Sequence, residues 1–317
     1  MTPGPLVSVV MPTYNREACL REGAESVFAQ TYDRWELLIV DDGSTDGTRA
    51  YLKTLRDPRV RCILREHSGN AALLRNMGVR AARGSHIAFL DSDDLWLPEK
   101  LTLQVEDLRA QPQCGWSYTG FAFIDEQKRE IPWGRRPRWQ AHRGWIVHAV
   151  ADSQSIIHTS TVMVERRLLE SVGGLDESLM RCELHDLSIR LAEASPATVV
   201  PAPLVQVRQH PGNRRTDWLD VLVCLNRVYS GAIARTASAP LRRTCRRQRA
   251  RASVEFVGKA RGAGRYADAR QALWTSFRYA WWCGGWWAAL LKTWLRPAIP
   301  GGVLSLYQRL KHVNQHA

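Results

Sequence analysis

No two cysteines in this 317-residue chain form a Cys-X-X-Cys pair. The seven cysteines are odd in number and widely scattered, a pattern that argues against both a disulfide framework and a zinc site built from paired thiolates. We therefore expect reduced, mostly buried thiols in a cytoplasmic protein.

The sequence also lacks any run of about 18 uncharged apolar residues, the length that a membrane-spanning helix needs. Its first apolar run, residues 6–11, is too short for the core of a secretory signal and follows no basic segment. No internal repeat at a fixed period is found. We therefore expect neither a spanning helix nor a secretory signal.

Hydrophobic residues make up 45% of the chain, which is enough to form a packed core. Its length allows one large domain or two modest ones. The net charge of +13 indicates an anionic partner. Nucleic acid, anionic lipid and a nucleotide substrate all satisfy that charge, which does not choose among them.

The first half of the sequence alternates between strand and helix patterns, and this order predicts an α/β fold with a mainly parallel sheet and helices on both faces. The predicted strands cover residues 6–11, 35–40, 60–64 and 85–90, and the predicted helices 17–30, a stretch ending at 55, 71–82 and 98–108. From residue 114 to about 207 the pattern is mixed, with strands at 116–124 and 161–164 and helices at 166–172 and 183–194.

After about residue 211 only helical patterns remain, at 218–234, 241–263, 266–279 and 286–295. We therefore predict a main domain over residues 1–213, with a first half to about 113 and a second half over about 114–213. Residues 214–317 form a basic, tryptophan-rich helical region.

The most informative segment is 87–94, where an apolar run ends in Asp91-Ser92-Asp93-Asp94. Ligands of open α/β sheets bind at the carboxyl ends of the strands. Crowded carboxylates repel one another unless a cation lies between them, and Mg²⁺ is commonly held by one or two carboxylates together with substrate phosphates. The segment therefore predicts a metal that carries a phosphorylated substrate.

Three weaker signals follow other predicted elements at the same edge. Tyr14, after the first strand, could stack on a nucleobase, and Asp42, after the second, could accept hydrogen bonds from a base or ribose. Arg75 could pair with a diphosphate or hold an aspartate. The alternatives are an ordinary strand-to-helix turn, an Asx turn with a helix cap, and a solvated helix charge.

Taken together and in this order, these motifs resemble the family 2 glycosyltransferases of the GT-A fold. That fold is α/β, with a Rossmann-like mixed sheet and helices on both faces, and the resemblance covers roughly residues 6–213. The matching segments are PTYNR at 12–16, VDDGSTD at 40–46, LDSDDLWLPEKL at 90–101, and the shorter segments 30–32, 35–36, 75–78, 172–177, 186–187, 190–192 and 208–213.

The resemblance implies an inverting, metal-dependent transfer from a nucleotide-diphospho-sugar to a hydroxyl of a glycan or lipid-linked acceptor. The donor that we expect is a UDP-sugar. Mn²⁺ or Mg²⁺ would be held by Asp91 and Asp93, with Asp93 the direct ligand, and would neutralise charge on the leaving group. The residues that it places at the donor are Pro12, Tyr14, Asn15, Asp42, Arg75, Asp91, Ser92 and His210.

The general base of the family is usually the aspartate of a Glu-Asp pair that begins a helix, and here that position holds Leu184. We rank Glu183 first as its replacement, then Asp186, then His185, whose ordinary pKa lies near neutrality. Asp186 sits two positions on from Leu184 and so about 200° around the helix axis. The alternative is that all three are structural or helix-terminal charges.

The C-terminal region combines arginines over residues 242–251 with tryptophans over 281–294. This is the composition of a helix in a membrane interface, so an anionic membrane surface is one predicted partner and peripheral placement on the inner face one predicted location. The alternative is that the tryptophans pack this region onto the main domain. Nucleic acid is a disfavoured partner because the chain has no recognisable motif for it. A binding protein without transfer activity is the alternative to an enzyme.

Overall fold

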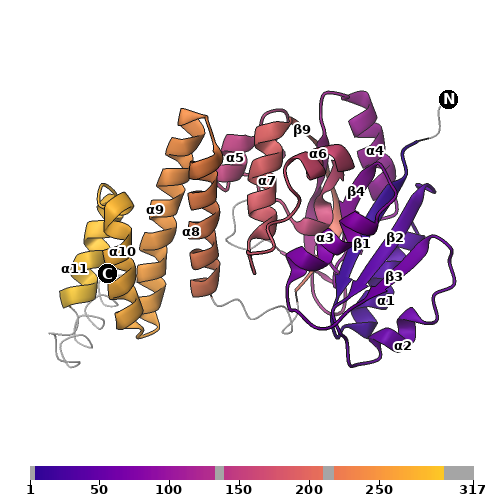
Figure 1. Cartoon of the computed structure of the whole chain (residues 1–317), viewed down its shortest axis with the longest axis horizontal. Helices are drawn as coiled ribbons and strands as arrows, with labels where there is room; N and C mark the ends of the chain where they lie inside the picture. The colour runs from indigo at the N-terminus through magenta and orange to yellow at the C-terminus, as the bar shows by residue number, and fades with distance from the viewer. Residues whose placement is uncertain (1–3, 133–138, 210–217, 296–317) are drawn as a thin grey trace, which may run out of the picture. The chain divides into compact units, whose positions relative to one another are not determined.

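The computed structural model describes residues 4–132, 139–209 and 218–295 (Figure 1). The chain divides into two compact units, Met1–Arg215 and Thr216–Ala317. The first unit holds the sheet, and the described part of the second unit is helical. Among the described residues the seven cysteines form no disulfide. Three are buried and Cys62 is exposed, so the expectation of mostly buried thiols was wrong.

Within the described residues, the first unit contains one mixed nine-stranded sheet with the order β3-β2-β1-β4-β8-β6-β9-β5, and β7 pairs with β6. The strands are β1 (Val7–Thr13), β2 (Trp35–Asp41), β3 (Val60–Leu64), β4 (His86–Phe89), β5 (Leu95–Trp96), β6 (Trp116–Ile124), β7 (Glu130–Ile131), β8 (Met163–Glu165) and β9 (Ala197–Arg208).

The half of the sheet made by β3, β2, β1 and β4 is parallel, as the alternating pattern predicts, and Figure 1 shows these strands side by side. Every residue of β1 and of β2 is buried, which explains their continuous apolar sequences, because a parallel sheet is covered on both faces. The antiparallel pairs of β8 with β4 and β6 make the whole sheet mixed. The parallel half therefore brings the loops after β1, β2 and β4 to one edge.

The helices of this unit are α1 (Glu17–Phe28), α2 (Thr48–Leu52), α3 (Ala71–Ala81), α4 (Lys100–Ala110), α5 (Val147–Ala151), α6 (Arg166–Ser171) and α7 (Glu183–Ala194), with a 3-10 turn η1 at Thr159–Thr161. Helix α3 begins at Asn70, whose side chain accepts a hydrogen bond from the Leu73 N–H. It lies close against β1, since a Cβ on Gly78 would collide with Val10. This approach fixes the position of Arg75, one turn earlier.

The second unit consists, in its described part, of α8 (Trp218–Arg235), α9 (Ala239–Gly262), α10 (Tyr266–Ala280) and α11 (Gly284–Leu295). Small and apolar residues form its core, among them Ala250, Leu273, Ala280 and Trp286. The Ser238 hydroxyl caps α9 by accepting from the Leu241 N–H. A search of the described residues for a helix of sufficient length and apolar character to traverse a bilayer found none.

Candidate active site

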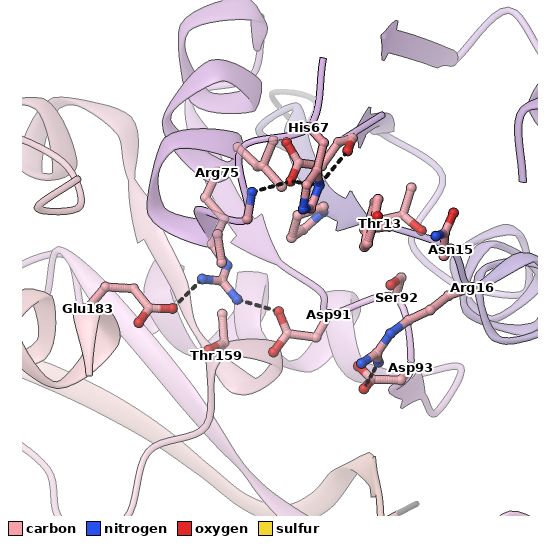
Figure 2. Close-up of a pocket in the computed structure, with 16 residues that line it drawn as sticks. Thr13, Asn15, Arg16, His67, Arg75, Asp91, Ser92, Asp93, Thr159 and Glu183 are labelled. Atoms are coloured by element: carbon pink, nitrogen blue, oxygen red, sulfur yellow. Dashed lines mark hydrogen bonds and ion pairs between the residues drawn. The ribbon is translucent and has the colours of Figure 1, made fainter. Parts of the chain in front are cut away.

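A cavity of about 610 Å³ opens at the edge where β1, β2 and β4 end (Figure 2). The starts of α3 and α7 and the turn η1 complete its wall. The sequence-predicted residues that line it are Pro12, Tyr14, Asn15, Asp42, Arg75, Asp91, Ser92, Asp93 and Glu183. The carboxyl edge of the parallel strands thus gathers residues that lie up to 171 positions apart, from Pro12 to Glu183.

An aromatic pair lies at one end of the cavity. The Tyr14 ring stacks on the His67 ring with centroids 4.0 Å apart and an interplanar angle of 22°. Asp42 holds the His67 ring in place. The Nδ1 atom of His67 lies 3.0 Å from the carbonyl oxygen and 3.0 Å from a carboxylate oxygen of Asp42. Tyr14 remains 39% exposed, so a flat ligand can still reach the pair.

Asp42 organises the loop that carries His67. Its buried carboxylate accepts hydrogen bonds from the backbone N–H of Ser68 at 3.0 Å and of Gly69 at 2.7 Å, and from the Ser68 hydroxyl at 2.8 Å. Gly69 has φ +67°, a conformation that suits glycine. Asp42 therefore shapes the cavity wall, whereas its contact with a base stays a prediction.

Asn15 ties the loop after β1 to the loop after β2. Its side-chain oxygen accepts from the Thr45 N–H at 2.7 Å, and its own N–H donates to the Ser44 hydroxyl at 2.9 Å. Its φ of 48° lies in the left-handed region, which asparagine tolerates better than most residues. The geometry gives Asn15 a positioning role at the cavity.

Arg75 bridges two carboxylates across the cavity. Its Nη2 donates to Asp91 Oδ1 at 2.5 Å and its Nη1 to Glu183 Oε1 at 2.7 Å, and Figure 2 shows the guanidinium between them. The side chain is 5% exposed. Burial alone would lower the pKa of Arg75, but the charges of Asp91 and Glu183 outweigh it and raise that pKa above its usual value. Arg75 is therefore a fixed positive charge.

The three carboxylates that follow β4 face different ways. Asp91 and Asp93 line the cavity, and Asp93 forms an ion pair with Arg16 (Figure 2). Asp94 is buried, where it accepts from the Ser160 hydroxyl at 2.5 Å and from the Arg208 N–H at 3.1 Å. Burial, together with the charges of Asp93 and Asp91, raises the pKa of Asp94 well above its usual range. Only two of the three are placed to meet a ligand.

A metal ion would find an incomplete set of protein ligands here. No group of three or more His, Cys, Asp or Glu side chains that could hold a metal occurs within the described ranges. Asp91 and Asp93 both line the cavity, and each is paired with an arginine, Arg75 and Arg16 respectively. Mg²⁺ is usually held by one or two carboxylates plus substrate phosphates and waters, so this pair fits a metal that arrives with a diphosphate.

The three residues ranked as general base separate at the start of α7. Glu183 lines the cavity. Asp186 is buried and pairs with Arg190 at 2.6 Å, and Arg190 donates to the carbonyl oxygens of Val172 and Gly174. Neither Asp186 nor His185 belongs to the cavity wall. Asp186 anchors a turn through Arg190, and Glu183 is the one of the three on the cavity wall, while the role of each as a base stays a prediction.

Comparison with known proteins identifies the family of the chain. The family model "Glycosyl transferase family 2" matches residues 8–172, just over half of the chain. The chain belongs to glycosyltransferase family 2.

Two curated relatives of this family 2 glycosyltransferase come from bacteria. TuaG of Bacillus subtilis, a glycosyltransferase named for teichuronic acid biosynthesis, is 40% identical over 38% of this chain and 48% of its own. The UDP-Glc:alpha-D-GlcNAc-diphosphoundecaprenol beta-1,3-glucosyltransferase WfgD of Escherichia coli is 44% identical over 32% of this chain and 40% of its own. The chain thus matches less than half the length of each of these relatives.

Two solved structures show the same fold. The mannosyltransferase PcManGT of Pyrobaculum calidifontis, in complex with GDP-Man and Mn²⁺, aligns with a TM-score of 0.60 at 21% identity, covering 99% of this chain and 84% of its own. TarS 1-349 of S. aureus, in complex with UDP, aligns with a TM-score of 0.58 at 18% identity, covering 80% and 71%. The GT-A fold predicted from the motifs is therefore confirmed.

Some residues in or beside the cavity carried no signal in the sequence. His67 and Arg16 were inside matching or neighbouring segments but received no role. Ser160 lies where no pattern was recognised, yet its hydroxyl joins the Asp91 N–H, at 3.0 Å, to Asp94. Their functions depend on partners distant in sequence, which local spacing does not reveal. His210 lies outside the described residues.

The family 2 glycosyltransferase should lose stability in mild acid through His185. Although His185 is only partly buried, the loss of hydration lowers its pKa to about 4 from an ordinary 6.5, against the opposing charge of Asp186. The unfolded chain therefore binds this proton first as the pH falls, so stability present above pH 6.5 is lost toward pH 4, by up to about 3 kcal/mol. Urea unfolding of wild type and His185→Gln across this range measures it. Parallel pH profiles of the two proteins would contradict the assignment.

Proposed function

We propose that this chain is an inverting, metal-dependent glycosyltransferase of polysaccharide synthesis. It moves a sugar from a nucleotide-diphospho-sugar to a hydroxyl of a glycan or lipid-linked acceptor, and the donor that we expect is a UDP-sugar. The observation that supports it best is the single guanidinium of Arg75, which pairs with both Asp91 after β4 and Glu183 at the start of α7 in the same cavity. The named ligands of similar structures, UDP, UDP-GlcNAc and GDP-Man with Mn²⁺, support the class of donor.

In this proposal, the nucleobase lies against the Tyr14 and His67 rings, and the diphosphate lies toward Asp91 and Asp93. Those two carboxylates would hold Mn²⁺ or Mg²⁺, whose charge offsets the negative charge that develops on the leaving diphosphate. Arg16, paired with Asp93, lies at the same edge and could turn to a phosphate oxygen. Ser92 and Pro12 contribute cavity wall.

Glu183 is the proposed general base. As the acceptor oxygen bonds to the anomeric carbon, the bond from that carbon to the diphosphate oxygen breaks, and its electron pair leaves with the nucleoside diphosphate. The acceptor proton passes to a carboxylate oxygen of Glu183, while Arg75 fixes the orientation of that carboxylate through the other oxygen. In this proposal the Glu183 carboxylate supplies the general base that Leu184 cannot. A general base in the cavity favours an enzyme that transfers sugar over a protein that only binds it.

Donor binding is tested by thermal unfolding with UDP and Mn²⁺, each alone and together. A ligand at about 100 times its dissociation constant should stabilise the protein by about 2.7 kcal/mol. We expect stabilisation by UDP that depends on the metal and is lost in Asp93→Asn.

The matched control is Asp33→Asn, an exposed aspartate outside the cavity, which should respond to UDP as the wild type does. Equal stabilisation by UDP with and without Mn²⁺ would remove the metal from the proposal. No stabilisation by UDP or GDP under any condition would remove the donor site.

A lipid-linked acceptor would place the reaction at a membrane surface, so peripheral placement on the inner, cytoplasmic face of the membrane is part of this proposal. A nucleic-acid partner is not, because the cavity edge is lined by the carboxylates of Asp91 and Asp93 and would repel phosphates that arrive without a cation.

A further inference from the structure

The positive charge of the chain belongs entirely to its second unit. Residues 1–215 contain 27 arginines and lysines and 27 aspartates and glutamates. Residues 216–317 contain 17 basic and 4 acidic residues, so their difference equals the +13 of the whole chain. The catalytic unit is electrically balanced, and the second unit carries the attraction to an anionic partner.

Two stripes of large apolar side chains are exposed on α10 and α11. On α10 they lie at spacings of three and four residues, and on α11 at spacings of four and three, so each stripe occupies one side of its helix. Their exposed fractions run from 47% to 84%. The stripes consist of Trp274 and Phe277 on α10 with Trp281 at its C-cap, and of Trp287, Leu291 and Trp294 on α11.

Contacts between the two helices join the stripes into one surface, here called the aromatic face. Trp287 donates its indole N–H to the Trp281 carbonyl at 2.7 Å. The buried Trp286 ring lies 5.5 Å from Phe277 and 5.0 Å from Trp287, centroid to centroid. Core residues such as Leu273 occupy a different side of each helix, so the aromatic face flanks the core and stays exposed.

The charges on these two helices are nearly all positive. Arg270 lies over the Trp294 ring at 5.8 Å, and Arg278 and Lys292 are exposed. Asp268 is the acidic residue within the bounds of α10 and α11, and it forms an ion pair with Arg265 at 2.6 Å. Tryptophan beside arginine and lysine suits the boundary between lipid headgroups and acyl chains, where rings enter and cations stay at the phosphates.

We propose that the aromatic face docks the chain onto a bilayer that contains anionic lipid. An exposed apolar surface of this kind is rare on a monomeric protein unless it binds something, and the cations around it match a phosphate surface. The proposed contact is interfacial, because rings that stand on the side of a helix suit a helix that lies in the plane of the headgroups. This inference deepens the proposed placement at a membrane by naming the surface, and rests on that proposal.

Flotation of the full chain with vesicles of phosphatidylcholine and phosphatidylglycerol tests the aromatic face. The triple variant Trp274→Gln, Trp281→Gln, Trp294→Gln should bind about 100-fold more weakly, because three large apolar side chains no longer enter the interface. The matched control is Trp145→Gln, which removes an exposed tryptophan of the first unit and should leave binding unchanged. The same three positions changed to phenylalanine should retain most of the binding.

Two further arms test the lipid chemistry and the fold of the variant. Binding should weaken on vesicles of phosphatidylcholine alone, and also when ionic strength rises from about 0.1 M to about 1 M, where the Debye length falls from about 10 Å to about 3 Å. If the triple variant unfolds at a lower temperature, Trp287→Gln with Leu291→Gln provides a second disruption on α11 alone. Stabilisation by UDP and Mn²⁺, measured on each variant, should match the wild type.

Equal vesicle binding by wild type and by both glutamine variants would overturn the proposal. So would a dimer, seen by light scattering, that the triple variant dissociates, because the face would then belong to a second copy. The experiment also separates this proposal from the proposed donor site. If the donor site is wrong, UDP and Mn²⁺ will not stabilise the protein, but vesicle binding will be unaffected.

Discussion

Replacement of Glu183 by glutamine is expected to lower kcat for sugar transfer by about 10²–10⁴-fold, the range that a positioned general base contributes. The amide keeps the size of the side chain and an oxygen that can accept from Arg75, which now donates to Glu183 at 2.7 Å. It cannot take a proton from the acceptor hydroxyl. Initial rates at saturating donor and acceptor measure the effect.

The donor site should survive this change, so stabilisation of Glu183→Gln by UDP and Mn²⁺ should stay close to that of the wild type. Glu170→Gln, an exposed glutamate on α6, is the matched control and should keep full activity. Full transfer rates in Glu183→Gln would exclude this residue as the base. Asp186 and His185, which lie next to this cavity wall on the same helix, would then be the next candidates to replace.

Replacement of Arg75 by glutamine should cost about 2–3 kcal/mol of folding free energy. Removing one partner of a buried ion pair typically costs about 3–5 kcal/mol, because the remaining charge is left unpaired. Here two carboxylates lose their partner, but Asp91 is 32% exposed and water will screen part of the loss. Urea unfolding of the purified variant measures the difference.

Arg80→Gln provides the comparison on the same helix. Arg80 is 61% exposed and lies 3.5 Å from Glu177, so its removal should cost less than about 0.5 kcal/mol. If Arg75→Gln proved as mild as Arg80→Gln, water would be able to solvate Asp91 and Glu183, and the bridge would not hold the two walls together. Loss of transfer in Arg75→Gln with intact UDP binding would place its main effect on Glu183.

The sheet and the position of the cavity could be predicted because their signals are local. A strand buried on both faces is a continuous apolar run, as in Val7–Thr13 and Trp35–Asp41. Strands that alternate with helices form a parallel sheet, and the carboxyl ends of such strands meet at one edge. Polar residues that directly follow those runs, such as Tyr14, Asp42 and Asp91, were therefore expected to converge, and they do.

Helix and strand limits were less well predicted. The helix expected to end at 55 ends at Leu52, and the one expected from 98 begins at Lys100. In the same way, the spacing within Asp91-Ser92-Asp93-Asp94 does not reveal that Asp94 turns inward to Ser160 and Arg208. Those partners lie 66 and 114 positions away, and only the folded chain brings them together.

By itself, the sequence determined the family, the α/β architecture and the acidic edge of the cavity, because each is written in short motifs and in the periodicity of apolar residues. The tertiary structure alone decided which carboxylate at the start of α7 faces the cavity. Glu183 and Asp186 differ by three positions on one helix, and the packing of that helix against the turn at Val172–Gly174 directs Asp186 to Arg190 and leaves Glu183 to Arg75. The rotation of a helix about its axis is set by what it packs against, and a linear pattern does not contain it.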